Sequence, residues 1–138
     1  MKERTEQTMI SMEELKDKIG GVFYFATTEN GQPRVRPFGF MMVFEDKLYF
    51  GCGTHKAAYP QMLENPYVEL CAFNKGAFVR VRGKVVIDDR PEVQAAMYEA
   101  GPFLKDTYNE ETGHYHMCFY LDEMSAMEFH GPEATRLV

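Results

Sequence analysis

The chain has 138 residues, of which 45% are hydrophobic and 14% aromatic, and it carries a formal net charge of −6 at pH 7. This length predicts one domain spanning residues 1–138 with a single core, and the apolar content excludes a disordered chain. The negative charge argues against general nucleic-acid binding, which requires a basic face, so no nucleic-acid partner is expected.

The sequence also indicates the compartment. It contains no apolar run of about 18 residues, so no membrane partner is expected. Residues 1–7 are charged and precede no apolar segment of the kind that a secretory signal needs. Cys52, Cys71 and Cys118 form no Cys-x-x-Cys pair, which predicts small apolar residues in a reducing compartment and no metal site. A cytoplasmic protein is therefore predicted.

Helix and strand signals follow one another along the first half of the chain. Ser11 and Glu14 form a capping box, which predicts a helix that runs to about Ile19 and ends at the two glycines that follow. Strand-forming residues surround turns at Asn30-Gly31 and at residues 45–46. They predict three antiparallel strands in a meander, over residues 22–27, 34–44 and 47–52.

The second half continues with short helices and strands. Proline suits the first position of a helix, so a helix is predicted from Pro60 to Asn65, after a loop at residues 54–59 with free backbone N–H groups. The alternation of valine and arginine from Val79 to Arg82 has the period of a half-buried strand. The other predicted elements are strands at 67–73 and 78–87, a helix at 88–100, an irregular segment at 103–116, and strands at 117–121 and 125–130.

Together these elements predict a mainly β fold with short helices. Neither an internal repeat nor a linker interrupts the pattern. Six or seven short antiparallel strands are expected to close into a small barrel, because open sheet edges invite aggregation.

The segment Gly51-Cys52-Gly53-Thr54-His55-Lys56 has the composition of an anion site at the end of a predicted strand. Glycines let the backbone approach an anion closely, a threonine hydroxyl donates a hydrogen bond, and a lysine adds positive charge. Arg34 and Arg36 share one face of a neighbouring predicted strand. The sequence therefore predicts a groove that holds a flat, phosphorylated cofactor. Arg34 either contacts this cofactor or pairs with a carboxylate.

Five short motifs follow one another between residues 30 and 68: Asn30-Gly31-Gln32-Pro33, Arg36-Pro37-Phe38, Leu48-Tyr49-Phe50, Thr54-His55-Lys56 and Asn65-Pro66-Tyr67-Val68. In this order and spacing they resemble the pyridoxamine 5′-phosphate oxidase-like flavoproteins, and the resemblance extends over roughly residues 20–87. It implies a split β-barrel that binds FMN and works as a homodimer, with two flavins at the subunit interface.

The resemblance also implies roles for individual residues. Arg36 would reach the flavin phosphate, Thr54 and Lys56 would belong to the phosphate loop, and His55 is a further candidate contact. The positions implied to line the isoalloxazine ring are Pro37, Phe38, Phe50 and Gly51. The partner subunit's Phe129 is expected to complete the site.

The chain departs from true pyridoxamine phosphate oxidases at three points. It has no tryptophan near Phe129, it has Met41 or a neighbour in place of a lysine, and it has Phe78 in place of a glutamine. These departures favour the nitroimidazole-resistance and general flavin-reductase-like branch over vitamin B6 oxidation.

The activity implied is that of an oxidoreductase which passes electrons from a reduced nicotinamide to a small, flat acceptor. Because the flavin carries the electrons, no catalytic residue is identified. A deazaflavin would require similar phosphate contacts. An alternative is a binding module of the same fold that holds haem through His114 and His116, or holds flavin without turnover. Arg80 and Arg82 are interpreted as a solvated or dimer-facing ladder.

Overall fold

The structure is a computed structural model that describes residues 2–4 and 9–138. Its strands are β1 (Lys2–Arg4), β2 (Phe23–Glu29), β3 (Gln32–Phe38), β4 (Met42–Phe44), β5 (Lys47–Gly53), β6 (Tyr67–Asn74), β7 (Ala77–Ile87), β8 (His116–His130) and β9 (Glu133–Arg136). Its helices are α1 (Met12–Ile19), α2 (Ala58–Glu64), α3 (Pro91–Ala100) and α4 (Leu104–Thr107). None of these described helices is long and apolar enough to cross a membrane.

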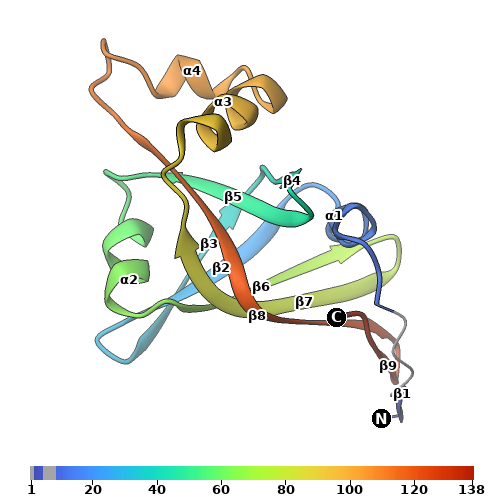
Figure 1. Ribbon diagram of the computed structural model, residues 1–138. Helices are drawn as coiled ribbons and strands as arrows, with labels where there is room; N and C mark the ends of the chain where they lie inside the picture. The colour runs from blue at the N-terminus through green and yellow to red at the C-terminus, as the bar shows by residue number, and fades with distance from the viewer. Residues whose placement is uncertain (1, 5–8) are drawn as a thin grey trace.

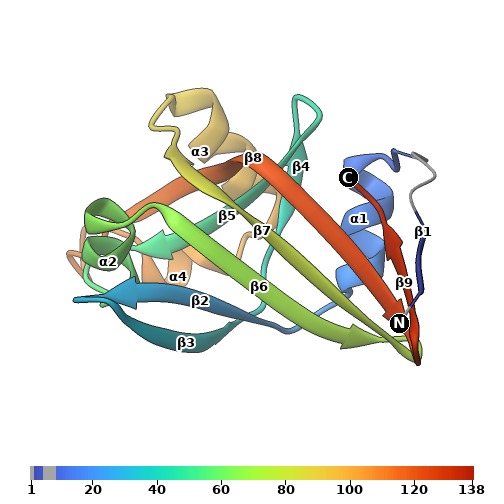
Figure 2. The same ribbon diagram turned by 90° about the horizontal axis from the view of Figure 1, so that it is seen from below.

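All the described strands belong to one sheet, and each pair runs antiparallel except β1 with β9, which is parallel. The main path has the order β1-β9-β8-β7-β6-β2-β3, while β5 pairs with β8 and β4. The sheet is strongly curved, with α1 and α2 at opposite ends (Figures 1 and 2). No ladder in the described part of the chain joins β3 to β4 or β5, so the curved sheet is open there. The predicted mainly β, antiparallel fold is confirmed.

Aromatic side chains fill the inside of the curved sheet. Phe23, Phe25, Phe50 and Phe119 are fully buried, and their rings contact one another at centroid separations of 5.5–6.0 Å. A large apolar side chain contributes about 1.5–3 kcal/mol when it is buried. A second cluster lies between the sheet and α3, and its buried members are Met42, Tyr49, Val93, Met97, Leu104 and Cys118.

The first helix has the predicted ends. The Ser11 hydroxyl accepts a hydrogen bond from the Glu14 backbone N–H at 3.1 Å, which caps the N-terminus of α1. Gly20 follows the last helical residue with φ of 83°, a conformation that glycine adopts readily. The capping box and the glycine stop are therefore confirmed.

The predicted three-strand meander is wrong. The return strand is divided into β3, which pairs with β2, and β4, which pairs with β5. The ladder of β3 ends at Phe38 because its partner Phe23 is the first residue of β2, so the residues after Phe38 have no strand to pair with. The second neighbour of β5 is β8, which comes much later in the chain.

The two strands predicted near the C-terminus are one strand of 15 residues, β8. Within β8, Glu123 has a φ of 51°, and the register between β8 and β7 shifts between Arg82 and Lys84. This bulge lets the strand bend without ending. A Cβ at Gly83 would lie 2.9 Å from the Asp122 carbonyl oxygen, so the neighbouring strands approach closely only because this residue is glycine.

Smaller differences concern helix ends and strand number. Helix α2 begins two residues before Pro60, which is tolerated because N–H groups of the first turn have no partner within the helix. Helix α3 begins at Pro91 rather than Asp88, and the segment predicted as irregular contains α4. The described residues form nine strands rather than six or seven. One predicted strand is divided, two predicted strands are joined in β8, and the short β1 and β9 carried no recognised signal.

Candidate functional site

A cavity of about 510 Å³ lies where the sheet is open, between β3, β5 and the start of α2. Its size is typical of cofactor pockets, which range over roughly 300–1,000 Å³. The residues that line it are Arg36, Pro37, Phe38, Gly39, Phe40, Gly51, Cys52, Gly53, Lys56, Ala57, Ala58 and Tyr108. The structure thus brings together five of the residues predicted for the site: Arg36, Pro37, Phe38, Gly51 and Lys56.

Arg36 is held at the wall of this cavity by neutral acceptors only. Its guanidinium donates to the Phe25 carbonyl at 3.2 Å, to the Thr27 hydroxyl at 2.8 Å and to the Gln61 side-chain oxygen at 2.6 Å. A guanidinium has five N–H donors, so two remain without an acceptor among the described residues. No described carboxylate forms an ion pair with it.

The charge of Arg36 is not balanced by its surroundings. Burial lowers the pKa of Arg36, but an arginine side chain stays protonated in proteins. Burial raises the pKa of the nearby Cys52 thiol to about 11, so this thiol is neutral at pH 7. Glu29 instead pairs with Arg34, at 3.3 Å. The cavity wall therefore carries an uncompensated positive charge.

Gln61 and Thr27 orient this guanidinium, and the sequence analysis did not identify either. Both are buried; the Thr27 hydroxyl donates to the Gln61 oxygen at 2.6 Å, and the Gln61 amide donates to Glu29 at 3.3 Å. Thr27 belongs to β2 and Gln61 to α2, so no local spacing in the sequence connects them. Only the buried polar character of the pair, visible in the fold, marks them.

The loop after β5 presents Lys56 but fewer free backbone donors than predicted. The Thr54 N–H donates to the Tyr115 carbonyl at 2.9 Å, and the Lys56 N–H donates to the Gly53 carbonyl at 3.0 Å. These two groups are therefore not available to an anion. The Lys56 side chain is exposed, and it forms no ion pair with a described residue.

Two glycines in β5 leave room for the rings of two histidines next to the cavity. A Cβ at Gly51 would collide with the imidazole Nε2 of His116, and a Cβ at Gly53 would lie 2.5 Å from Cε1 of His55. Larger residues at these positions would force both rings to move. Glycine here thus serves close packing of side chains around the cavity.

The other predicted site residues lie outside the lining of this cavity. The Phe50 side chain is fully buried in the core, between the rings of Phe25 and Phe119. Arg34 is exposed and paired with a carboxylate, which is one of the two alternatives predicted for it. Thr54 and His55 follow β5 in the adjacent turn, and Phe129 lies on β8.

The histidines predicted as a haem-binding pair have different surroundings. The His114 ring stacks on His55, with centroids 3.7 Å apart, whereas His116 Nδ1 contacts the Gln94 side-chain oxygen at 2.8 Å. The pKa of His55 is lowered, first by burial and then by the nearby His114 and Lys56. Burial lowers the pKa of His116 to about 4. Within residues 2–4 and 9–138, no three His, Cys, Asp or Glu side chains are grouped to hold a metal ion.

Tyr108 is a further lining residue that the sequence analysis missed. It follows α4, in a polar segment whose pattern carried no strand or helix signal. Its ring lies 4.8 Å from the ring of His116, and burial raises the pKa of its hydroxyl. An aromatic side chain with a polar end is well suited to contact a flat ligand.

This architecture defines a class: small, mainly antiparallel β proteins with a cationic cavity between an open sheet and a short helix. The family model for pyridoxamine 5′-phosphate oxidase matches residues 13–112. The chain therefore belongs to the pyridoxamine 5′-phosphate oxidase-like family. None of the curated proteins compared with the chain matches it.

Solved structures agree with this assignment. A NimC/NimA family protein from Clostridium acetobutylicum is 37% identical, with 94% of this chain and 95% of that chain covered and a TM-score of 0.82. A pyridoxamine 5′-phosphate oxidase-related, FMN-binding protein from Nostoc punctiforme is 18% identical, with 91% and 85% covered and a TM-score of 0.65. An FAD-binding protein from Mesorhizobium loti is 17% identical, with 87% and 96% covered and a TM-score of 0.59. The last two likenesses concern the fold alone.

Proposed function

We propose that the chain binds FMN in the cavity between β3, β5 and α2 and serves as a single-domain oxidoreductase. The observation that carries this proposal is the uncompensated charge of Arg36, which has two unused donors at a cavity wall that also includes Lys56. A phosphate ester supplies the negative charge and the acceptors that these two side chains lack. FMN presents such a phosphate together with a flat ring.

The remaining lining residues suit the ring and its ribityl chain. Pro37, Phe38 and Tyr108 offer apolar or aromatic surface, while Gly51 and Gly53 let the β5 backbone come close. Family membership and the flavin binding stated for the Nostoc and Mesorhizobium proteins support the choice of a flavin. A deazaflavin has similar contacts, and the absence of a balancing carboxylate favours either over an uncharged ligand.

Bound FMN would supply the redox chemistry, accepting electrons from a reduced nicotinamide and passing them to a small, flat acceptor. The chain's own part is to hold the phosphate with Arg36 and Lys56 and to fix the guanidinium through Thr27 and Gln61. Tyr108 would limit the access of water to the ring.

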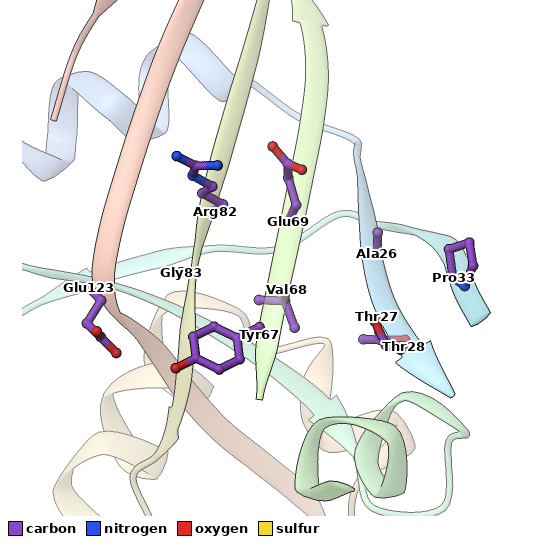
Figure 3. Close-up of a pocket in the computed structure, with 10 residues that line it drawn as sticks. All are labelled: Ala26, Thr27, Thr28, Pro33, Tyr67, Val68, Glu69, Arg82, Gly83 and Glu123. Atoms are coloured by element: carbon purple, nitrogen blue, oxygen red, sulfur yellow. The ribbon is translucent and has the colours of Figure 1, made fainter. Parts of the chain in front are cut away.

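We further propose that the protein is a cytoplasmic homodimer, formed through the outer face of the sheet. Five large apolar side chains on this face are between 52% and 68% exposed: Tyr24, Val35, Tyr67, Phe73 and Phe78. Such an extent of exposed apolar surface is typical of an interface. Tyr67 is one of the residues that line a groove on the same face, whose volume is about 550 Å³. Figure 3 shows these lining residues. Phe129 lies opposite Phe78, so the partner subunit's Phe129 would take part in the interface.

The test is the absorption spectrum of the purified protein, with the released chromophore identified by mass. Flavin bands and the mass of FMN are expected, followed by oxidation of a reduced nicotinamide when an acceptor is added. A colourless protein that does not take up added FMN would overturn the proposal. A Soret band would instead support the haem alternative.

A further inference from the structure

A second cationic cavity lies on the outer face of the sheet, where β6, β7, β8 and β9 run side by side. Its volume is about 400 Å³, and the residues that line it are Glu69, Arg80, Arg82, Ser125, Met127 and Arg136. We call it the arginine cavity. None of its residues lines the cavity around Arg36.

The strand register places these side chains in two adjacent rows. One row consists of Glu69, Arg82 and Ser125, and the next consists of Arg80, Met127 and Arg136. Side chains directly opposite on neighbouring strands have Cβ atoms about 4.5–5.5 Å apart. Figure 3 shows Arg82 and Glu69 projecting from β7 and β6 on the same face. Three guanidinium groups and one carboxylate therefore share a small area.

Arg80 and Arg82 form no ion pair with a carboxylate among the described residues. The Arg82 side chain donates no hydrogen bond to a described residue and forms no ion pair with one, although Glu69 lies opposite it on β6. The Arg80 guanidinium stacks over the Phe129 ring at 4.7 Å, which fixes its plane and leaves its edge free to donate. Arg136 Nε donates to the backbone oxygen of Val138 at 3.3 Å. One carboxylate, that of Glu69, does not balance three guanidinium groups, so the cavity keeps a net positive charge.

We propose that the arginine cavity binds a small anion with at least two negative charges, of the phosphate-ester or pyrophosphate type. Guanidinium groups bind phosphoryl oxygens in pairs, and the Ser125 hydroxyl adds a further donor. The cavity is also a local exception in a chain with a net charge of −6, so its positive charge does not follow from the overall composition.

If the protein dimerises as proposed, the bound anion should affect dimerisation, and this step alone rests on the proposed function. The two arginine rows lie on the sheet between Tyr67 and Phe78, which belong to the proposed interface. Burying unpaired guanidinium groups between subunits is unfavourable. A bound anion would remove this penalty, so it should also strengthen dimerisation.

The test is calorimetric titration with sodium pyrophosphate at constant ionic strength, on the protein as purified and again after saturation with FMN. One pyrophosphate per subunit is expected after saturation with FMN, when the FMN phosphate occupies the cavity around Arg36, and any additional binding before saturation is assigned to that cavity. Arg82→Gln and Arg80→Gln should each weaken this binding about tenfold or more, because each removes charge-assisted hydrogen bonds. Glu69→Gln removes the one carboxylate and should strengthen binding several-fold.

Two further variants make the result specific. Lys84→Gln removes a positive charge from the same strand but outside the cavity, and it should leave pyrophosphate affinity unchanged. Arg36→Gln should also leave it unchanged, while reducing FMN binding. Because pyrophosphate affinity is expected to rise in Glu69→Gln, a folding defect cannot produce the expected pattern.

Several outcomes would overturn the proposal. One is no binding by the wild-type protein at millimolar pyrophosphate, and another is equal affinity in all arginine-cavity variants. Loss of pyrophosphate binding in Arg36→Gln rather than Arg82→Gln would assign the anion to the flavin cavity. Dissociation of the dimer by Arg82→Gln without any pyrophosphate binding would show that the arginines contact protein instead. Failure of FMN binding alone would overturn the proposed function but not this one.

Discussion

Arg36 and Arg90 are both held by several hydrogen bonds, but their partners differ in charge. Arg90 donates to Glu45 at 2.6 Å and to Asp88 at 2.9 Å, and Tyr49 also donates to Asp88 at 2.6 Å. These contacts raise the pKa of Arg90 and lower that of Asp88 and Glu45. Among the described residues, the Arg36 guanidinium donates only to a carbonyl, a hydroxyl and an amide oxygen.

The difference separates a structural network from a candidate binding site. Around Arg90 two carboxylates balance the charge, and the group joins the β4–β5 turn to the segment before α3. Around Arg36 the protein fixes the position of a cation without balancing it. An anionic ligand is the partner that such an arrangement lacks.

The largest effect is expected for Arg36→Gln. The variant loses the charge and the two unused donors, so FMN affinity should fall about 100-fold or more. Titration of FMN with detection of flavin fluorescence measures this change. Thermal unfolding of the FMN-free protein provides the control, since a collapsed fold would also abolish binding.

Lys56→Ala should have the next largest effect, about tenfold on FMN affinity, since a single exposed charge is removed from the phosphate loop. The fold should be retained because the Lys56 side chain has no ion pair with a described residue. Unchanged flavin content in purified Lys56→Ala would contradict the role assigned to this lysine.

Gln61→Glu would convert the Arg36 region into one that resembles the Arg90 region. The new carboxylate would lie at the position of the oxygen that Arg36 now contacts at 2.6 Å, and would balance the guanidinium. FMN affinity should fall several-fold. Thermal stability in the absence of FMN should also fall, because the second carboxylate oxygen replaces an amide that now donates to Glu29 at 3.3 Å. Equal or tighter FMN binding would show that the charge of Arg36 is not what the ligand recognises.

Arg90→Gln tests the other side of the comparison. It leaves Asp88 and Glu45 without their cation, so the Tm should fall by a few degrees, with FMN affinity unchanged. The loss of stability in this variant should be smaller in acid than at pH 7. The pKa of Asp88 is lowered in the folded protein, so its ion pair with Arg90 stabilises the fold above the unfolded pKa of Asp88, and this stabilisation disappears as the pH falls below it. Thermal unfolding at pH 7 and at pH 3 measures both effects.

The smallest effect concerns His116, which belongs to a neutral network with Gln94. Its folded pKa of about 4 is below the unfolded value, so the unfolded state binds more protons between about pH 6.5 and 4. Stability should therefore decrease as pH falls through this window. His116→Gln should reduce that decrease, and an unchanged pH profile in thermal unfolding would show that another group is responsible.

The local elements of this fold and its hairpins could be predicted from the sequence, and the pairing between distant strands could not. The capping box at Ser11, the turn at Asn30-Gly31 and the alternation in β7 each act over a few residues. The break after Phe38 and the pairing of β5 with β8 depend on where the distant strands end and lie. Local periodicity carries no information on such contacts.

The candidate site shows the same limit. Arg36 and Lys56 could be selected because charge beside strand ends and glycines is an anion signal that short motifs carry. Thr27, Gln61 and Tyr108 could not, because they come from separate elements. Only the tertiary fold brings Thr27 and Gln61 to Arg36, and Tyr108 to the cavity. The sequence also left open whether Arg34 contacts the cofactor or pairs with a carboxylate, and in the structure Arg34 forms an ion pair with Glu29 at 3.3 Å.

The most direct test is to titrate FMN into the wild-type protein, Arg36→Gln and Arg90→Gln side by side, with the Tm of each recorded. We predict that the wild type and Arg90→Gln bind FMN with the same affinity, and that Arg36→Gln binds it about 100-fold more weakly while it still unfolds cooperatively. Equal affinity in all three proteins, or no binding by the wild type, would contradict the assignment of the Arg36 cavity as the flavin site.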